Sequence, residues 1–128
     1  FSKGHLSMKK IEAFIRHEAF DAIRRDLLEN GIPSLSVSDV KGSGRQGGVV
    51  ERYRGAELVI HLRPKLKIEC VVSDEEVDVV VNSILEHAQT GEVGDGKIFI
   101  LPVETAIRVR TGERGGDVLD THDSPQES

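Results

Sequence analysis

The chain has 128 residues, a mass of 14.1 kDa and a formal net charge of −5, which indicates a single acidic domain. The acidic balance argues against a general nucleic-acid binder, and no apolar run is long enough to cross a membrane. The single cysteine, Cys70, excludes an internal disulfide, and with no evident signal peptide we expect a cytoplasmic protein. Its place in the strand-like sequence IECVV predicts a buried, inert thiol.

The first predicted elements are a strand, a helix and a second strand. Residues 1–7 precede the only methionine, Met8, and we set them aside as an expression remnant. The sequence KKIEAFI then alternates polar and apolar residues, as a half-buried strand does. Residues 18–30 predict an amphipathic helix, and SLSVSDV alternates again as a second strand. The apolar face of the helix consists of Phe20, Ile23, Leu27 and Leu28, and its stop signal of Asn30, Gly31 and Pro33.

A long loop is predicted next. Residues 42–57, GSGRQGGVVERYRGAE, are rich in glycine and show neither a helical nor a strand period. A loop of this length inside a compact domain is uncommon and is usually functional or disordered. The sequence LVIHLRPKLKIECVV then returns to strand character, with Pro64 at a break or an edge.

The second half of the chain predicts another helix and closing strands. Ser73 and Glu76 form a capping box, and the helix that follows is expected to stop near Gly91. KIFIL and TAIRVR are interpreted as closing strands, and residues 114–128 as a polar, mobile tail. The apolar positions of the helix are Val77, Val80, Val81, Ile84, Leu85 and Ala88.

The order of these elements is β-α-β, long loop, β-α-β, which is the α+β, ferredoxin-like arrangement with two helices on one face of the sheet. The strands nevertheless carry apolar residues on both faces: Ile68, Cys70 and Val72 on one, Val71 on the other. A sheet that is apolar on both faces must be covered on both. We therefore expect a second subunit to supply the second cover.

The sequence GEVGDGKIF combines glycines with one lysine, as a phosphate-binding loop does. Gly91, Gly96 and Lys97 fit the frame G-x-x-x-x-G-K-[ST], but Ile98 replaces the hydroxyl residue and the loop leads from a helix into a strand. A nucleotide-triphosphatase loop is therefore rejected. Gly94 and Gly96 still allow a backbone concavity that binds anions. The alternative is a helix C-cap at Gly91 followed by a flexible turn.

Several stretches together resemble one family. KGSGRQGG, ERYRGAE and TGEVGDGKIF are similar to segments of the PII nitrogen-regulatory signal proteins, and PKLKIECVV and IRVRTGE fit the same family from Met8 to about Glu113. The resemblance implies a regulator and not an enzyme. It implies a homotrimer with inward-packed sheets, ATP or ADP between subunits, and 2-oxoglutarate beside Mg-ATP. The long loop, called the T-loop, is then expected to engage an ammonium transporter or an enzyme of nitrogen and carbon metabolism.

The resemblance also implies roles for single residues at the phosphates. Arg108 and Arg110 match arginines that reach phosphate from the neighbouring subunit. They alternate along a predicted strand and are expected to face one side of it; without the resemblance they are interpreted as a solvated edge. The loop that wraps the phosphates is matched by Gly94, Asp95, Gly96 and Lys97. The remaining nucleotide positions are Gly42, Ser43, Gly44, Arg45 and Gln46 at the other lip and Ser36, Glu69 and Val71 around adenine and ribose.

Two residues match the effector site. Gln46 matches the residue that contacts both Mg²⁺ and 2-oxoglutarate, and an amide oxygen suits that ion. Lys65 matches the lysine that pairs with the 2-oxoglutarate carboxylate; its alternative role is that of an edge lysine that prevents aggregation. The family pattern is broken at Glu18 and Ser43, where phenylalanines are usual, and the first of these lies near the effector pocket.

The familiar modification sites are absent from the sequence. Leu58 stands where many bacterial members carry a uridylylated tyrosine, and Ala56 where some photosynthetic members carry a phosphorylated serine. We therefore expect control by ligands alone.

Two other function classes stay open on the residues themselves. One is a phosphate-ester-processing enzyme, since ferredoxin-like folds also host acylphosphatases; it would need an anion loop where the chain has RHEAFD. The other is a small-molecule sensor without nucleotide, which would not need the GDGK sequence. No nucleophile–base motif is present, and the histidines have no metal-site spacing. They are His5, His17, His61, His87 and His122.

Overall fold

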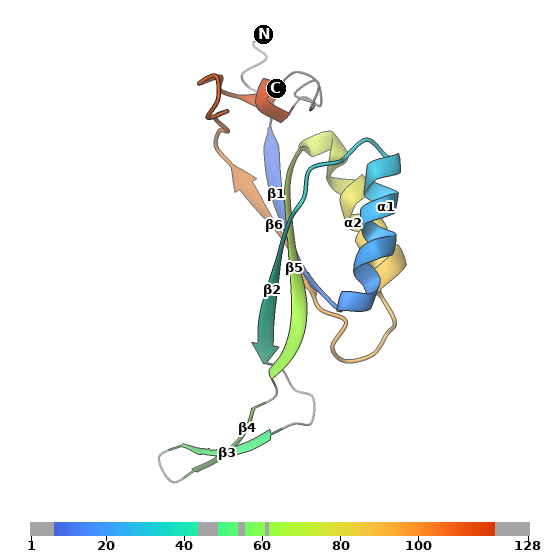
Figure 1. Cartoon of the computed structure of the whole chain (residues 1–128), viewed down its shortest axis with the longest axis vertical. Coiled ribbons are helices and arrows are strands. Elements are labelled where there is room, and N and C mark those ends of the chain that lie inside the picture. The colour runs from blue at the N-terminus through green and yellow to red at the C-terminus, as the bar shows by residue number, and fades with distance from the viewer. Residues whose placement is uncertain (1–6, 44–48, 54–55, 61, 120–128) are drawn as a thin grey trace.

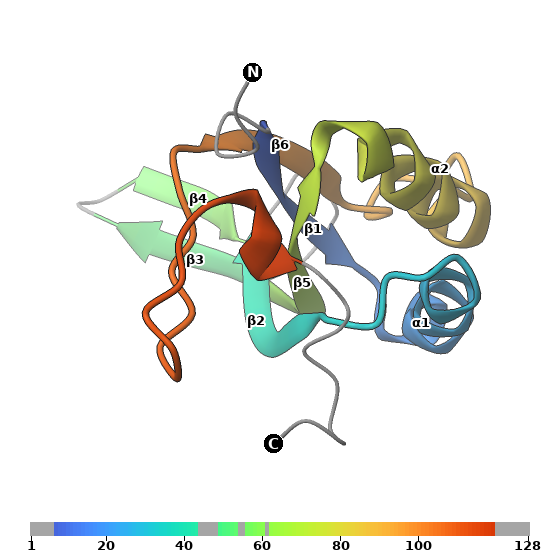
Figure 2. The ribbon, with the colours of Figure 1, turned by 90° about the horizontal axis from the view of Figure 1, so that it is seen from above.

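The computed structural model describes residues 7–43, 49–53, 56–60 and 62–119, and its main body is one layer of helices on one sheet (Figure 1). The sheet strands are β1 (Met8–Ile15), β2 (Ser36–Ser43), β5 (Leu62–Ser73) and β6 (Lys97–Val103), and the helices are α1 (Phe20–Glu29) and α2 (Val77–Ala88). The strand order is β2-β5-β1-β6, with every neighbouring pair antiparallel. Both helices lie on the same face of the sheet (Figure 2). The predicted order of elements and the ferredoxin-like α+β fold are confirmed.

The core lies between this sheet and the two helices. Alternate residues of β1 and β5 point toward the helices, so Ile11, Ala13 and Ile15 are buried together with Ile68, Cys70 and Val72. Ile23 and Leu27 of α1 are fully buried against them, whereas Leu28 is 55% exposed. Leu28 was expected on the same helical face; it lies one residue, about 100° of helix rotation, beyond Leu27 and therefore leaves the apolar stripe. Burial raises the pKa of Cys70 to about 11, as expected for an inert thiol.

Local signals set the helix ends. Short 3-10 turns, η2 (His17–Ala19) and η3 (Asp74–Glu76), lead into the two helices. At the second, Glu76 Oε1 accepts hydrogen bonds from both the backbone nitrogen and the Oγ of Ser73, each 3.2 Å long, as predicted for a capping box. α2 ends at Ala88, because Gln89 is already extended, so the alternative of a C-cap at Gly91 was wrong.

The opposite face of the sheet mixes apolar and charged side chains. The register places Phe99 opposite Glu12 and Leu101 opposite Lys10, and these two apolar residues are 47% and 39% exposed. Lys10 Nζ lies 2.8 Å from Glu69 and 3.1 Å from Glu12. The hydrogen bond with Glu69, followed by that with Glu12, raises the pKa of Lys10, and the pKa of Glu69 is lowered in return. The open face of the sheet is therefore apolar along β6, as expected, whereas the central strands β1 and β5 carry a network of ion pairs on that face.

The segment between β2 and β5 contains regular structure that the sequence analysis missed. It runs from residue 44 to 61 and includes two antiparallel strands, β3 (Val49–Tyr53) and β4 (Ala56–Ile60). The expectation of a loop over 42–57 without strand character was therefore wrong. VVERY and AELVI are runs of five residues each, too short for a two-residue period to stand out. Pro64 lies in β5 beyond the last residue that pairs with β1, which agrees with its expected edge position.

The chain after β6 also differs from the expectation. TAIRVR was interpreted as a strand, but only Ile107 makes an isolated bridge, to Arg114, and Gly112 N donates to Arg108 O at 2.7 Å. Arg108 and Arg110 therefore lie in a tight hairpin turn, and the argument that a strand aligns them fails. Gly112 and Gly115 have φ values of 78° and 93°, which reverse the chain. Residues 114–119 are held by Gly115 N to Ala106 O and form η4 (Gly116–Leu119), so this part of the tail is ordered.

In the described part of the chain, neither helix is long and apolar enough to span a membrane.

The buried stripe of α1 predicts a sharp difference between neighbouring leucines. Leu27→Ala is expected to lower the free energy of unfolding by about 2–5 kcal/mol, because it leaves a cavity between α1 and the sheet. Leu28→Ala removes the same atoms from an exposed position and is expected to cost well under about 1 kcal/mol. Urea unfolding at one fixed protein concentration measures both; equal losses would contradict the assignment of the stripe.

Candidate functional site

The glycine loop, residues 90–96, connects α2 to β6 and is closed by one carboxylate. Asp95 Oδ2 accepts hydrogen bonds from the backbone nitrogens of Thr90 at 2.7 Å and Gly91 at 2.9 Å, and Oδ1 accepts one from Thr90 Oγ1 at 2.6 Å. Asp95 therefore ties the start of the loop to its end. Gly94 and Gly96 have φ values of 103° and 110°, which non-glycine residues rarely adopt.

Asp95 stays ionised over the whole range of ordinary pH. The hydrogen bonds from the Thr90 side chain and backbone are the main cause, and the Gly91 N–H and the charge of Arg16 add to them. Together they lower the pKa of Asp95 to about 2, although partial burial acts in the opposite direction. The loop thus carries a fixed negative charge that holds its own backbone in place.

Arg16 fastens this loop to the end of β1. Its Nη2 donates to Val93 O at 2.9 Å, and its Nε lies 3.5 Å from Asp95 Oδ1, close enough for an ion pair. Arg16 is not among the site residues predicted from the sequence. Arg16 and Val93 are 77 residues apart in the sequence, and no local pattern links them.

Gly96 is required by contact with β1 as well as by its backbone angle. A Cβ at this position would lie 1.6 Å from the carbonyl oxygen of Phe14. The loop therefore rests directly on the backbone at the C-terminal end of β1, a central strand. This close approach fixes where β6 begins and which way its first side chains point.

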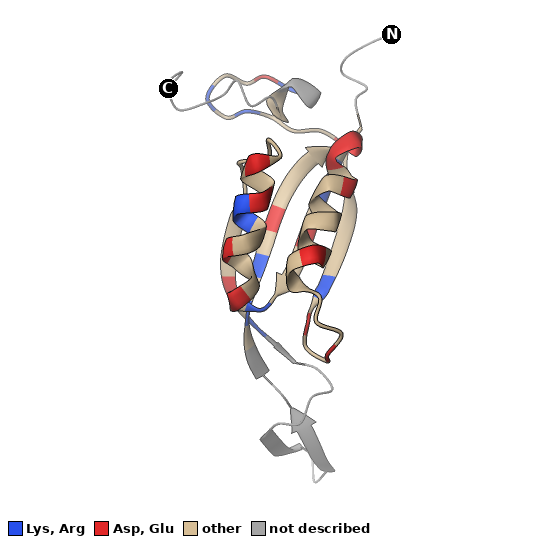
Figure 3. Cartoon of the chain, turned by 90° about the vertical axis from the view of Figure 1, so that its right-hand side faces the viewer, with Lys and Arg blue, Asp and Glu red and all other residues tan. Residues whose placement is uncertain are grey.

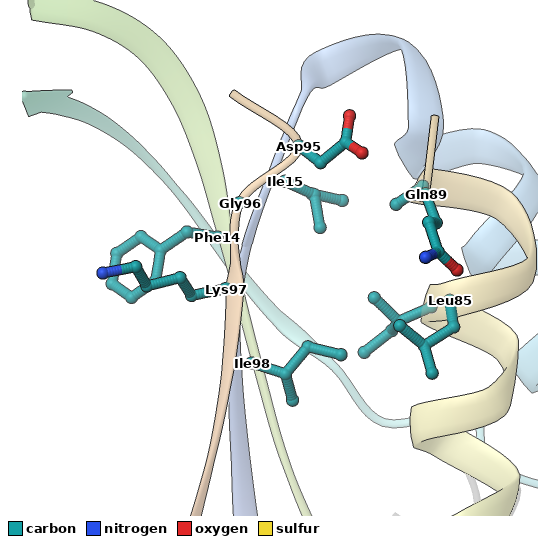
Figure 4. Close-up of a pocket in the computed structure, with 10 residues that line it drawn as sticks. Phe14, Ile15, Leu85, Gln89, Asp95, Gly96, Lys97 and Ile98 are labelled. Atoms are coloured by element: carbon teal, nitrogen blue, oxygen red, sulfur yellow. The ribbon is translucent and has the colours of Figure 1, made fainter. Parts of the chain in front are cut away.

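The two charges of the GDGK sequence point to opposite sides of β6 (Figure 4). The Lys97 side chain lies beside Phe14 on the open face of the sheet, whereas Asp95 lies on the helix side with Gln89 and Leu85 (Figure 4). A hollow of about 370 Å³ lies on the helix side, lined mainly by apolar side chains of α2 and β6. Both oxygens of Asp95 already accept hydrogen bonds within the loop, so Lys97 is the residue whose charge faces outward.

Lys65 joins the glycine loop to the base of the long segment between β2 and β5. Its Nζ donates to the carbonyl oxygen of Gly94. Lys65 is half-buried, so it does not act as a free edge lysine. The sequence-predicted effector lysine and the sequence-predicted phosphate loop are thus neighbours in one chain.

Other predicted site residues lie in β2 and β5. Ser36 pairs with Glu69 across β2 and β5, and Val71 pairs with Lys10 across β5 and β1. Gly42 and Ser43 form the end of β2. Gly44, Arg45 and Gln46 lie outside the described residues. Leu58 lies within β4.

Arg108 and Arg110 lie at the other end of the molecule. The chain passes from the glycine loop along all of β6 to reach them, and seven strand residues span roughly 20 Å. Figure 1 shows the turn at the upper end of the sheet and the loop below α2. Arg108 pairs with Glu113 and also donates to Val118 O at 3.2 Å, and its side chain is 14% exposed. One chain therefore does not bring the arginines to the glycine loop.

Comparison with known proteins gives the family. A family model described as nitrogen regulatory protein P-II matches residues 8–113. The chain belongs to the P-II family. P-II proteins of Nostoc punctiforme and Pasteurella multocida are 51% and 50% identical over 112 residues, which are 88% of this chain and 100% of each relative. These names denote regulatory proteins, which agrees with the expectation of a regulator and not an enzyme.

Solved structures agree with the P-II assignment. Bacillus subtilis GlnK matches with a TM-score of 0.73 and 38% identity, covering 87% of this chain and 97% of that chain. A B. subtilis GlnK–ATP complex gives 0.70 and 33%, with 87% and 96% covered. Arabidopsis thaliana PII bound to citrate gives 0.69 and 42%, with 86% and 90% covered.

The contact of Gly96 with β1 predicts how this P-II protein responds to added methyl groups. Gly91→Ala places a Cβ in open space at φ 87° and is expected to cost only the backbone strain, about 1–2 kcal/mol. Gly96→Ala adds a clash with Phe14 O to the same strain and is expected to cost about 1–3 kcal/mol more. Chemical unfolding of both variants checks this, and an equal loss would contradict the described loop position.

The lowered pKa of Asp95 predicts a loss of stability in acid. Because the folded value, about 2, lies below the ordinary value of 3.8, the carboxylate stabilises the fold fully above about pH 4 and progressively less toward pH 2. The difference in unfolding free energy between the wild type and Asp95→Asn should therefore shrink over this range. Thr90→Val, which removes the largest cause of the shift, should make the fall smaller. A difference that is independent of pH would contradict the role of Asp95.

Proposed function

We propose that this protein is a homotrimeric P-II signal protein that binds ATP or ADP between its subunits. In this proposal 2-oxoglutarate binds beside Mg-ATP at the base of the T-loop, the predicted loop of residues 42–57 that leads from β2 toward β5. The T-loop in turn regulates an ammonium transporter or an enzyme of nitrogen and carbon metabolism. The single cysteine is in keeping with action in the cytoplasm.

One observation carries the proposal: the residues predicted to bind phosphate lie at or beyond opposite ends of β6. Gly94 to Lys97 supply backbone N–H groups and one ammonium, which suit phosphate. Arg108 and Arg110 supply guanidinium groups, which bind phosphate in two-pronged fashion, but β6 holds them far away. A second subunit can bring its arginines to the loop of the first. The exposed Phe99 and Leu101 on the open face support such an association, because both described α-helices lie on the other face.

The effector site is proposed at Lys65. A dicarboxylate that binds the Lys65 ammonium competes with the carbonyl of Gly94 for it. Binding of the effector therefore changes both the glycine loop and the base of the T-loop, since Lys65 lies in β5 between them. Gln46 is proposed to contact Mg²⁺ and the effector. Among the similar structures, one is a GlnK–ATP complex and one a PII bound to citrate, itself a polycarboxylate.

Regulation is proposed to rest on ligands alone. Leu58 has no hydroxyl for nucleotidylation, so the T-loop conformers respond only to the ligands that bind them differently. Mg-ATP with 2-oxoglutarate is expected to favour one conformer, and ADP another.

Calorimetry tests the ligands. We expect ATP and ADP to bind, 2-oxoglutarate to bind only when Mg-ATP is present, and ATP to remain without sustained turnover. Lys65→Met should abolish the 2-oxoglutarate signal while ATP still binds. Light scattering should give three times the chain mass of 14.1 kDa. Absence of nucleotide binding, or a monomer at micromolar concentration, would refute the proposal.

Mixing two variants tests the site between subunits. Lys97→Ala and Arg108→Ala should each lose most ATP affinity, whereas Arg114→Ala, a charge removed from the same hairpin, should not. When the two defective chains are unfolded and refolded together, every mixed trimer regains one interface with both side chains intact. Recovery of high-affinity sites is therefore expected only in the mixture. No recovery would mean that both residues act within one subunit, contrary to the described separation.

A further inference from the structure

Three potential metal ligands meet on the outward surface of the helix pair. Asp26 of α1 and Glu86 and His87 of α2 place one ligand atom each within 4.8 Å of one another. We propose that this trio binds a divalent transition-metal ion of the zinc type. The spacing of the histidines predicts no metal site; Asp26 and His87 are 61 residues apart and meet only through the packing of the two helices.

The donor set suits such an ion. One imidazole nitrogen and two carboxylate oxygens are ligands that zinc accepts in three-residue sites, with water in the fourth position. His87 Nε2 lies 3.1 Å from Asp26 Oδ2. Two ligands of a tetrahedral zinc at about 2.0–2.1 Å lie roughly 3.3 Å apart, so this pair is already near the required spacing. The imidazole binds in its neutral form, and any proton on Nε2 leaves to solvent.

A residue outside the trio orients Asp26. Asn30 Nδ2 donates to Asp26 Oδ1 at 2.9 Å and to the Asp26 carbonyl oxygen at 2.7 Å. These bonds hold one carboxylate oxygen and leave the other directed at His87. Hydrogen-bonded neighbours of this kind fix the orientation of metal ligands and raise metal affinity.

Burial and position fit a metal that links the two helices. The side chains of Asp26 and His87 are 25% and 26% exposed, so the ion can reach them while part of their hydration is already removed. Glu86 is exposed and can turn toward the ion at little cost. Figure 3 shows the two helices side by side on this surface with acidic residues on both. The ion would cross-link α1 to α2 on the side of the molecule away from the open face of the sheet.

The chain offers a matched control. His17 Nε2 and Asp39 Oδ1 form a histidine–carboxylate pair at 2.8 Å, and within the described residues the only cluster of three such ligands is the one at Asp26. Zinc is titrated into the nucleotide-free protein by calorimetry, and cobalt(II) absorption reports the coordination number. One ion per chain is expected. Glu86→Gln and His87→Gln should each weaken zinc by more than tenfold, Asn30→Ala by about tenfold to a hundredfold, and His17→Gln should leave it unchanged.

A second readout guards against misfolded variants. Zinc should raise the thermal midpoint of the wild type and of His17→Gln but not of His87→Gln, because a ligand that binds only the folded state stabilises it. Circular dichroism of Glu86→Gln should match that of the wild type, because the substituted side chain is exposed. Absence of saturable zinc binding at micromolar concentration, or equal binding by wild type and His87→Gln, would overturn the proposal.

Discussion

The sheet has two faces, and both α-helices of the described residues lie on the same one. Strands β1 and β5 lie in its centre, so the side chains that alternate away from the buried Ile11 and Ile68 need another environment. On part of that face the side chains are charged and pair with one another, through the ionic contacts of Lys10 with Glu12 and Glu69. The edge at Phe99 and Leu101 does not, and it stays exposed. An apolar edge beside paired charges favours a specific protein contact over loose aggregation, since a misaligned partner would leave charges unpaired.

The same sheet fixes the chemistry of the glycine loop. Gly96 rests on the Phe14 carbonyl and has a φ of 110°, so the chain departs there from the regular alternation of a strand, in which residues two apart would face the same side. Asp95 turns inward and holds the loop; Lys97 turns outward and carries the available charge. The acid in this motif is therefore a positioning residue for the backbone. Its hydrogen bonds with Thr90 and Gly91 preorganise the N–H groups that an anion would meet.

Most helices and strands could be predicted from the sequence because each depends on signals from a few neighbouring residues. Alternation in β1, the capping box at Ser73 and the stop after Glu29 each depend on a few neighbouring residues, and the structure confirms them. Several features were missed where the residue pattern alone does not decide the structure. Whether IRVR becomes a strand depends on a free sheet edge, and here Arg108 bonds Glu113 in a turn. Arg16 and the Asp26–His87 contact depend on helix and loop packing, which no spacing in the sequence encodes.

In the proposed trimer, the contacts that Arg108 and Lys65 make within their own chain take part in ligand sensing. Arg108 already contacts Glu113 and the Val118 carbonyl, and Lys65 already contacts Gly94. Each cation must therefore exchange an internal partner for a ligand oxygen, and only the difference between the two contacts contributes to affinity. That exchange loosens the C-terminal hairpin of one subunit and the T-loop base of the next. Binding of the nucleotide then changes the internal contacts that the effector must displace, and binding of the effector changes those that the nucleotide must displace. Each ligand therefore changes the affinity for the other by the same factor.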